Sequence, residues 1–222
     1  YKGYQNIIKL VSKAHLEGMY YKPRLDLATL SLFSDDLIVI SPGGRGPVAS
    51  YIQEHQDELA LEVATSLKDV FGGNFYLGAQ RVGGAHEEMV EMASLEIAKK
   101  LDVPMVAMNN VYTLLREDAL LRDILFSIQT GKVMDDMSRA KFQNNELFFK
   151  SSQDMATVFH DHPDWLENTV VIADQCQIDI EMEQVLLPHF NCPDNQSSEE
   201  YLEALVWKGI DRCYEERTPE II

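Results

Sequence analysis

The feature that most constrains the fold is the apolar run Val103–Met108, which lies between a helical pattern and a group of polar residues. A short apolar run bounded in this way predicts a strand that is buried on both faces, as in a parallel sheet. Proteins of the α/β class carry their chemistry just beyond the carboxyl ends of such strands. The residues that follow, Asn109–Tyr112, are therefore the first place to look for a functional site. They offer two amides and a phenol, which are poorly suited to catalysis.

Two further runs, Leu37–Ile40 and Asn74–Ala79, have the length and the branched or aromatic content of strands. Helical patterns separate the three runs and cover residues 48–53, 56–70 and 86–100. The last of these helices has Glu87 and Glu88 in its first turn and Lys99 and Lys100 in its last, which matches the helix dipole at both ends. This alternation of strand and helix predicts an α/β fold with a parallel sheet.

The rest of the chain is predicted to be mainly helical. Expected helices cover residues 4–17, 25–33, 116–128, 165–177 and 198–217, and a further helix begins with Ser152 as its N-cap. A turn is expected at 20–24, a loop at 130–142, and short extended segments at 147–149 and 186–190. We expect residues 1–150 to form the α/β part and residues 151–222 to form a helical remainder.

The charge balance limits the kinds of partner. With 19 basic and 36 acidic residues the formal charge is −17, so direct nucleic-acid binding is not expected, because that affinity depends on Lys and Arg. An acidic surface is suited to docking a basic partner. The three cysteines form no CxxC pair, and there is no long apolar run. We therefore expect a cytoplasmic protein without a membrane span.

Several local patterns could in principle carry chemistry. The loop Ser41–Pro47 is rich in glycine and proline but has neither a P-loop nor a GxGxxG pattern, so it is interpreted as a turn. His160 and His162 form the one His-x-His pair, and Asp135-Asp136 is an acidic pair in a loop; both are expected to be solvated. GxSxG is absent. The residues themselves therefore predict no catalytic residue, metal ligand or cofactor site.

An ordered series of segments nevertheless resembles one family over nearly the whole chain. The segments are Gly3–Lys13, Glu17-Gly18, Lys22–Arg24, Asn74–Leu77, Ile128–Lys132, Asp135-Asp136, Leu166–Thr169, Leu187-Pro188, Glu200–Leu202 and Gly209. Together they are similar to the polymerase-and-histidinol-phosphatase (PHP) domain of the alpha subunit of bacterial DNA polymerase III. The resemblance implies a distorted (β/α)7 barrel, which this chain would contain incompletely and extend with C-terminal helices.

The resemblance also implies metal ligands at strand ends, and the chain departs from that pattern at Gly43, Asn110 and Tyr112. Metal-binding members have Cys where this chain has Gly43, and they read Asn-Asp-Val-His where it reads Asn109–Tyr112. Residues 78–82 also lack the acidic and His residues of many members. Amide and phenol groups are poor ligands for transition metals, so we expect a degenerate site without metal.

The resemblance therefore implies a non-catalytic piece of a replicative polymerase. This piece would act as a scaffold and as a docking site for the proofreading exonuclease subunit and other replicase subunits. One alternative is an active metal-dependent phosphoesterase or 3′–5′ exonuclease domain; another is a stand-alone acidic interaction module. We also expect the chain to be part of a longer protein and, as an incomplete barrel, to self-associate.

Overall fold

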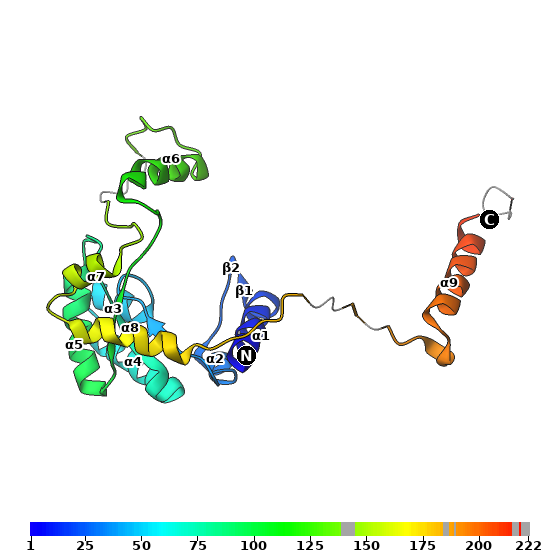
Figure 1. Ribbon diagram of the computed structural model, residues 1–222, viewed down its shortest axis with the longest axis horizontal. Coiled ribbons are helices and arrows are strands. Elements are labelled where there is room, and N and C mark those ends of the chain that lie inside the picture. Colours follow the sequence, from blue (N-terminus) through cyan, green and yellow to red (C-terminus); the bar gives the residue numbers. More distant parts are fainter. Residues whose placement is uncertain (139–144, 184–186, 189, 215–217, 219–222) are drawn as a thin grey trace. The chain divides into compact units, whose positions relative to one another are not determined.

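The computed structural model describes residues 1–138, 145–183, 187–188, 190–214 and 218 (Figure 1). The chain divides into two compact units, Tyr1–Asp179 and Ile180–Ile222. Each unit is described by itself below.

The core of the first unit is a parallel sheet of three strands. These are β3 (Val39–Ser41), β4 (Phe75–Gln80) and β5 (Met105–Met108), in the order β3-β4-β5. Ile40 pairs with Tyr76, and Gly78 pairs with Val106. All three strands lie where the apolar runs predicted them, although β3 begins two residues after the predicted start. The α/β class and the parallel pairing are therefore confirmed.

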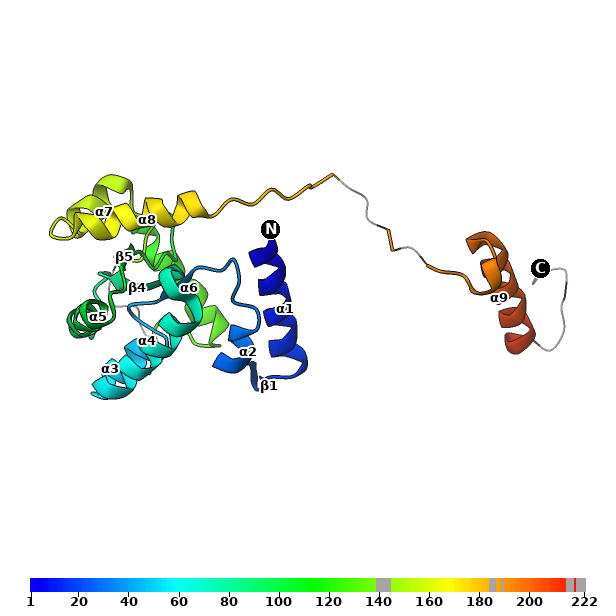
Figure 2. The same cartoon turned by 90° about the horizontal axis from the view of Figure 1, so that it is seen from below.

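Helices cover both faces of this sheet. Helices α3 (Pro47–Gln53), α4 (Asp57–Phe71) and α5 (Glu87–Leu101) follow the strands, and the short 3₁₀ helix η1 (Gly72–Asn74) leads into β4. Figure 2 shows α8 (Pro163–Gln175) on the side of the sheet opposite α3 and α4. Phe75–Ala79 in β4 are all buried, because a strand covered on both faces has no solvent side. The most deeply buried large side chains are Phe75, Phe159, Ile52, Leu77, Val48 and Val90.

The N-terminal region packs beside this core. Helix α1 (Lys2–Leu16) ends just before Gly18, as predicted, and α2 (Leu27–Ser31) is capped by the Asp26 carboxylate. The segment predicted as a turn at 20–24 is instead a small antiparallel hairpin of β1 (Met19–Tyr20) and β2 (Lys22–Pro23). Its turn residue, Tyr21, has φ +58°. The two strands have only two residues each, which is too short to show the alternation of polar and apolar residues from which a strand is predicted.

Beyond β5 the chain makes a long excursion and then returns. It contains the 3₁₀ helix η2 (Arg116–Asp118) and α6 (Ala119–Gln129), and it is closed by a parallel bridge between Thr113 and Phe148. The predicted short strand at 147–149 is therefore a single bridge. The predicted loop at 130–142 lies partly outside the described residues.

Helix α7 (Ser152–Val158) corrects one prediction. Its N-cap is Ser151 and not Ser152: the Ser151 hydroxyl accepts a hydrogen bond from the Asp154 amide, and the Asp154 carboxylate accepts from the Ser151 amide. The predicted interruption at 160–163 is confirmed, since α8 begins at Pro163.

The second unit contains the 3₁₀ helix η3 (Pro193–Asn195) and α9 (Ser198–Cys213). Ser197 and Glu200 form a capping box at the start of α9. Residues 186, 189 and 215–217 of the predicted elements lie outside the described residues. In the part of the chain that the structure describes, no helix is both long and apolar enough to span a membrane.

Candidate functional site

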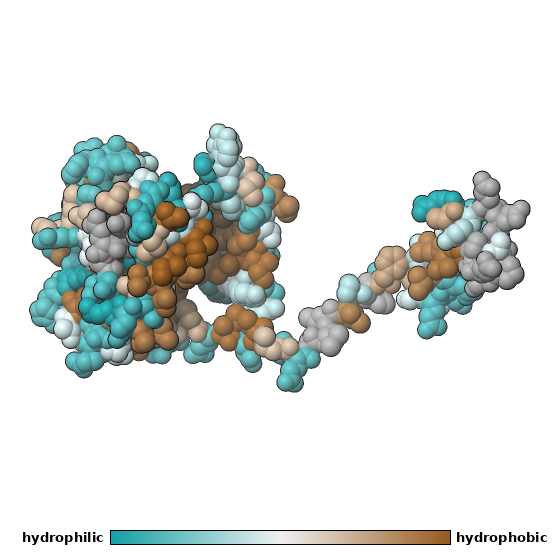
Figure 3. Space-filling model, turned by 90° about the horizontal axis from the view of Figure 1, so that it is seen from above, coloured by the Kyte–Doolittle hydropathy of each residue, from teal (hydrophilic) through white to brown (hydrophobic). Residues whose placement is uncertain are grey.

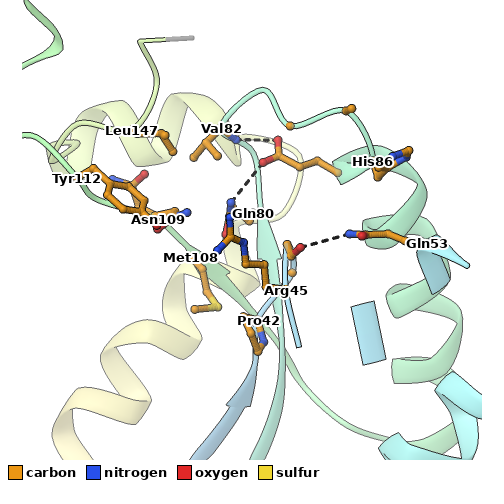
Figure 4. A pocket seen from close by; sticks show the side chains of 16 residues that line it. Pro42, Arg45, Gln53, Gln80, Val82, His86, Met108, Asn109, Tyr112 and Leu147 are labelled. Atoms are coloured by element: carbon orange, nitrogen blue, oxygen red, sulfur yellow. Dashed lines mark hydrogen bonds between the residues drawn. The ribbon is translucent and has the colours of Figure 1, made fainter. Parts of the chain in front are cut away.

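A cavity of about 510 Å³ opens at the carboxyl ends of the three parallel strands (Figure 4). Parallel strands that pair in register end at the same edge of a sheet, so the loops that follow them meet there. The lining residues are Pro42–Arg45, Gln53, Gln80, Val82, Gly84–Glu87, Met108–Asn110, Tyr112 and Leu147. Gly43, Asn110 and Tyr112, which the sequence singled out, thus share one cavity.

Gly43 occupies a position with no room for a side chain. A Cβ atom built there would lie 2.6 Å from the carbonyl oxygen of Gly78 and 3.0 Å from the amide nitrogen of Gln80. Gly78 is similarly enclosed, because its Cβ would lie 2.2 Å from Met108 Sδ. The absence of a side chain at these two glycines therefore lets the ends of β3, β4 and β5 pack closely together. A cysteine ligand at position 43 does not fit this backbone.

Glu87 is the one carboxylate among the described residues that line the cavity. Its Oε2 accepts hydrogen bonds from the backbone amides of Val82 and Gly83, both at 2.8 Å, and Gln80 Nε2 lies 3.4 Å from its Oε1. The carboxylate therefore holds the loop between β4 and α5 in place. Its position in the first turn of α5 also favours a negative charge.

The segment after β5 is fixed by backbone contacts. Asn109 Nδ2 donates a hydrogen bond to the Phe148 carbonyl at 2.9 Å, and the Tyr112 amide donates to the Leu147 carbonyl at 2.8 Å. Asn109 Oδ1 is buried and has no hydrogen-bond partner within the described residues. A single amide oxygen is a weak ligand and does not by itself make a metal site.

The cavity residues do not fit the metal set that the resemblance implies. Within the described ranges, no three His, Cys, Asp or Glu side chains are close enough together to hold a metal ion. The cavity is lined by one carboxylate, which is bonded to backbone amides, and by the exposed His86. Its other polar side chains include amides and a phenol. What the site offers is hydrogen bonding, with Gln53 Nε2 bonded to the Gly44 carbonyl at 3.2 Å.

The histidine pair and the acidic pair singled out in the sequence are not among the residues that line this cavity. The His162 ring stacks on Trp165 with centroids 3.7 Å apart, and His160 Nδ1 lies 3.1 Å from the Thr157 carbonyl oxygen. Asp136 pairs with Lys132 at 3.1 Å. The loop Ser41–Pro47 does contribute to the cavity, and it leads into α3 through Gly46, which has φ +114°.

Sequence reasoning missed an ion cluster around Arg81, the residue that follows β4. The Arg81 guanidinium bonds Glu91 at 2.6 and 2.8 Å and Asp161 at 2.7 and 2.9 Å, and it also donates to the Val158 carbonyl at 2.9 Å. These bonds lower the pKa of Asp161 to about 2 and raise the pKa of Arg81. Since 80 residues separate Arg81 from Asp161, no local pattern could have revealed the cluster.

Comparison with known proteins identifies related chains. Residues 1–82 match the PHP domain family model. Over 221 residues the chain is 36% identical to the DNA polymerase III subunit alpha of Borreliella burgdorferi, covering 99% of this chain and 19% of that protein. The corresponding subunit of Treponema pallidum is also 36% identical over 221 residues, with the same shares covered. That of Haemophilus influenzae is 34% identical over 211 residues, with 95% of this chain and 18% of that protein covered. The chain thus spans about a fifth of the length of these curated relatives.

Proposed function

Because this chain is related along nearly its whole length to DNA polymerase III alpha subunits and matches the PHP domain over residues 1–82, we propose that it forms part of the PHP domain of a bacterial replicative polymerase. The activity of the whole protein would then be DNA-directed DNA synthesis. The alignment with about a fifth of each relative supports a contribution to such a protein rather than the complete enzyme.

The three parallel strands would form one side of a distorted (β/α)7 barrel. Their register and their covering helices support this assignment, since a barrel of this class has parallel strands inside and helices outside. The cavity would then lie at the catalytic face of the barrel, where the loops after the strands converge.

The cavity is proposed to be a metal site that has lost its ligands. One observation carries this proposal: the three ligand positions converge on one cavity, where they are Gly43, Asn110 and Tyr112. The backbone at Gly43 leaves no space for a thiolate. Transition metals bind imidazole and thiolate groups far better than amides or phenols. The domain is therefore proposed to work without a metal or another cofactor.

A domain without chemistry can still organise its partners. We assign it the role of a scaffold in the replicase that docks the proofreading exonuclease subunit. The formal charge of −17 favours docking of a basic protein surface and disfavours direct contact with DNA. A scaffold of this kind is proposed to work in the cytoplasm.

Metal titration tests the loss of the site. Zinc and manganese would be titrated separately into the whole parent domain and into a Glu87→Gln, His86→Ala variant, with metal content measured after dialysis. We expect no stoichiometric binding to either protein and no EDTA-sensitive nuclease activity. Stoichiometric binding that the variant abolishes would refute the proposal and favour the active phosphoesterase or exonuclease.

A further inference from the structure

The loop between β4 and α5 forms part of the rim of the strand-end cavity. It comprises residues 81–86 and is called here the rim loop. Four of its residues line the cavity: Val82, Gly84, Ala85 and His86. The Glu87 carboxylate holds the loop from within, because it accepts hydrogen bonds from the amides of Val82 and Gly83, both at 2.8 Å.

Arg81 is the first residue of the rim loop and is held by bonds of its own. An arginine side chain has five N–H donors, and all five of those in Arg81 are used. Two donate to Glu91, two donate to Asp161 and one donates to the Val158 carbonyl. A rigid guanidinium group bonded on all sides in this way has one fixed orientation.

Two of the partners of Arg81 come from the helix pair α7 and α8. Val158 is the last residue of α7, and Asp161 lies between α7 and α8. The guanidinium also lies over the Phe159 and Trp165 rings, 4.9 and 5.9 Å from their centroids. Arg81 therefore joins the rim loop to the helix pair, and this set of contacts is called here the Arg81 clamp.

The helix pair is packed on the sheet at a second place. Many hydrophobic side chains of the first unit lie at its surface (Figure 3), but those of Phe159 and Trp165 are only 1% and 2% exposed. In α8, Asn168 Nδ2 donates a hydrogen bond to the Met105 carbonyl of β5 at 2.7 Å. The helix pair is thus bonded to β5 directly and to the end of β4 through Arg81.

The charges of the Arg81 clamp are partly buried. The exposed fractions of the Arg81, Glu91 and Asp161 side chains are 25%, 17% and 43%. Removing one partner from a partly buried ion cluster is costly, because the remaining charge loses bonds that water does not fully replace. A guanidinium that loses Asp161 therefore has to shift toward solvent, and its backbone is directly joined to Val82.

We propose that the Arg81 clamp couples the conformation of the rim loop to the docking of α7 and α8, so that loosening either one loosens the other. Such coupling is reciprocal, because the free energy that links two sites is the same in both directions. Since α8 is the last helix of the first unit, a displacement of α8 is transmitted to the rim of the cavity. The inference does not depend on whether the cavity holds a metal.

Hydrogen exchange of the 222-residue chain, followed at single amides by NMR, tests the coupling. Asp161→Asn weakens the clamp at the helix pair. We expect it to speed exchange of the Val82 and Gly83 amides by roughly fivefold or more relative to the Ala64 amide. Ala64 is fully buried in α4 and reports opening of the whole first unit. Asp174→Asn, at an exposed position of α8, should leave this ratio unchanged.

The reverse experiment weakens the contacts on the cavity side. Glu87→Gln removes the charge that holds the rim loop, and it should speed exchange of the His162 and Trp165 amides relative to that of Ala64. These two amides donate the hydrogen bonds, at 3.0 and 3.2 Å, that form the turn into α8. Glu88→Gln changes the exposed neighbouring residue and is the matched control. Circular dichroism checks that each variant folds.

A double variant tests whether Arg81 carries the coupling. In an Arg81→Gln background, Asp161→Asn should have no further effect on the Val82 and Gly83 amides, because residues that act through one contact are not additive. Equal acceleration of all amides, Ala64 included, would show only a loss of overall stability and would overturn the proposal. Faster exchange confined to the substituted side, no change at all, or additive effects in the double variant would overturn it as well. If Arg81→Gln does not fold, the two single variants decide.

Discussion

At the residue scale, the convergence of the three strand ends depends on Gly43. Its conformation is open to other residues, but the carbonyl of Gly78 lies where a Cβ would be placed. Gly43→Ala should therefore destabilise the chain by about 1–3 kcal/mol, because an added methyl group in a tightly packed site forces the backbone to shift. Urea unfolding followed by circular dichroism measures this difference.

Gly73 is the matched control for that substitution. A Cβ at Gly73 would meet nothing within 4 Å, so Gly73→Ala should change the free energy of unfolding by less than about 1 kcal/mol. Equal destabilisation by the two substitutions would show that close packing at the strand ends is not the cause.

The stability of the chain is expected to depend on pH through Asp161. Its folded-state pKa of about 2, set mainly by the hydrogen bonds to Arg81, is lower than the usual value of 3.8. A depressed carboxyl pKa contributes stability above the unfolded-state pKa and loses it as the pH falls through the folded-state value. Asp161→Asn should therefore lower the melting temperature at neutral pH, and the deficit should shrink between pH 4 and 2.

Asp174 in α8 provides the comparison for this pH series. It is exposed, and Asp174→Asn should leave the melting temperature close to that of the unmodified chain at each pH. A deficit of Asp161→Asn that stays constant from pH 7 to 2 would exclude the proposed ionic contribution.

At the element scale, two neighbouring serines have different roles at the start of α7. Ser151 exchanges hydrogen bonds with Asp154, whereas Ser152 is the first residue of the helix. Ser151→Ala should cost about 1 kcal/mol of unfolding free energy, since an N-cap side chain satisfies an otherwise unpaired amide. Ser152→Ala should cost much less, and a thermal unfolding comparison of the two variants distinguishes them.

Local sequence patterns predicted most of the helices and strands. All three strands and most helices lie within a few residues of their predicted bounds, because apolar runs and helical periodicity report burial directly. Two predictions were wrong: the turn expected at 20–24 is part of the β1–β2 hairpin, and the N-cap of α7 is Ser151 and not Ser152. Both depend on the conformation of a single residue, which the pattern of neighbouring residues does not specify.

At the scale of the whole molecule, both edges of the sheet are open within the part of the chain that the structure describes. Within the described residues β3 and β5 each pair with one strand only. In α1 the apolar side chains of Ile7, Ile8, Val11 and Leu16 are exposed, whereas Leu10 and Ala14 are buried. Unpaired edges and exposed apolar faces favour association. We expect the isolated chain to show a mass that rises with concentration in light scattering; a monomer at all concentrations would contradict this.

The sequence by itself determined the α/β class, the order of the strands along the chain and the resemblance to DNA polymerase III alpha subunits, which the comparisons confirmed. It also identified Gly43, Asn110 and Tyr112, although their degenerate role remains a proposal. Only the tertiary structure decided that these residues share one cavity, that Glu87 is held by backbone amides, that Arg81 binds Asp161, and that α6 turns its apolar side to solvent. The physical reason is that these features depend on contacts between distant parts of the chain. Periodicity records which residues are apolar, whereas packing decides what each of them touches.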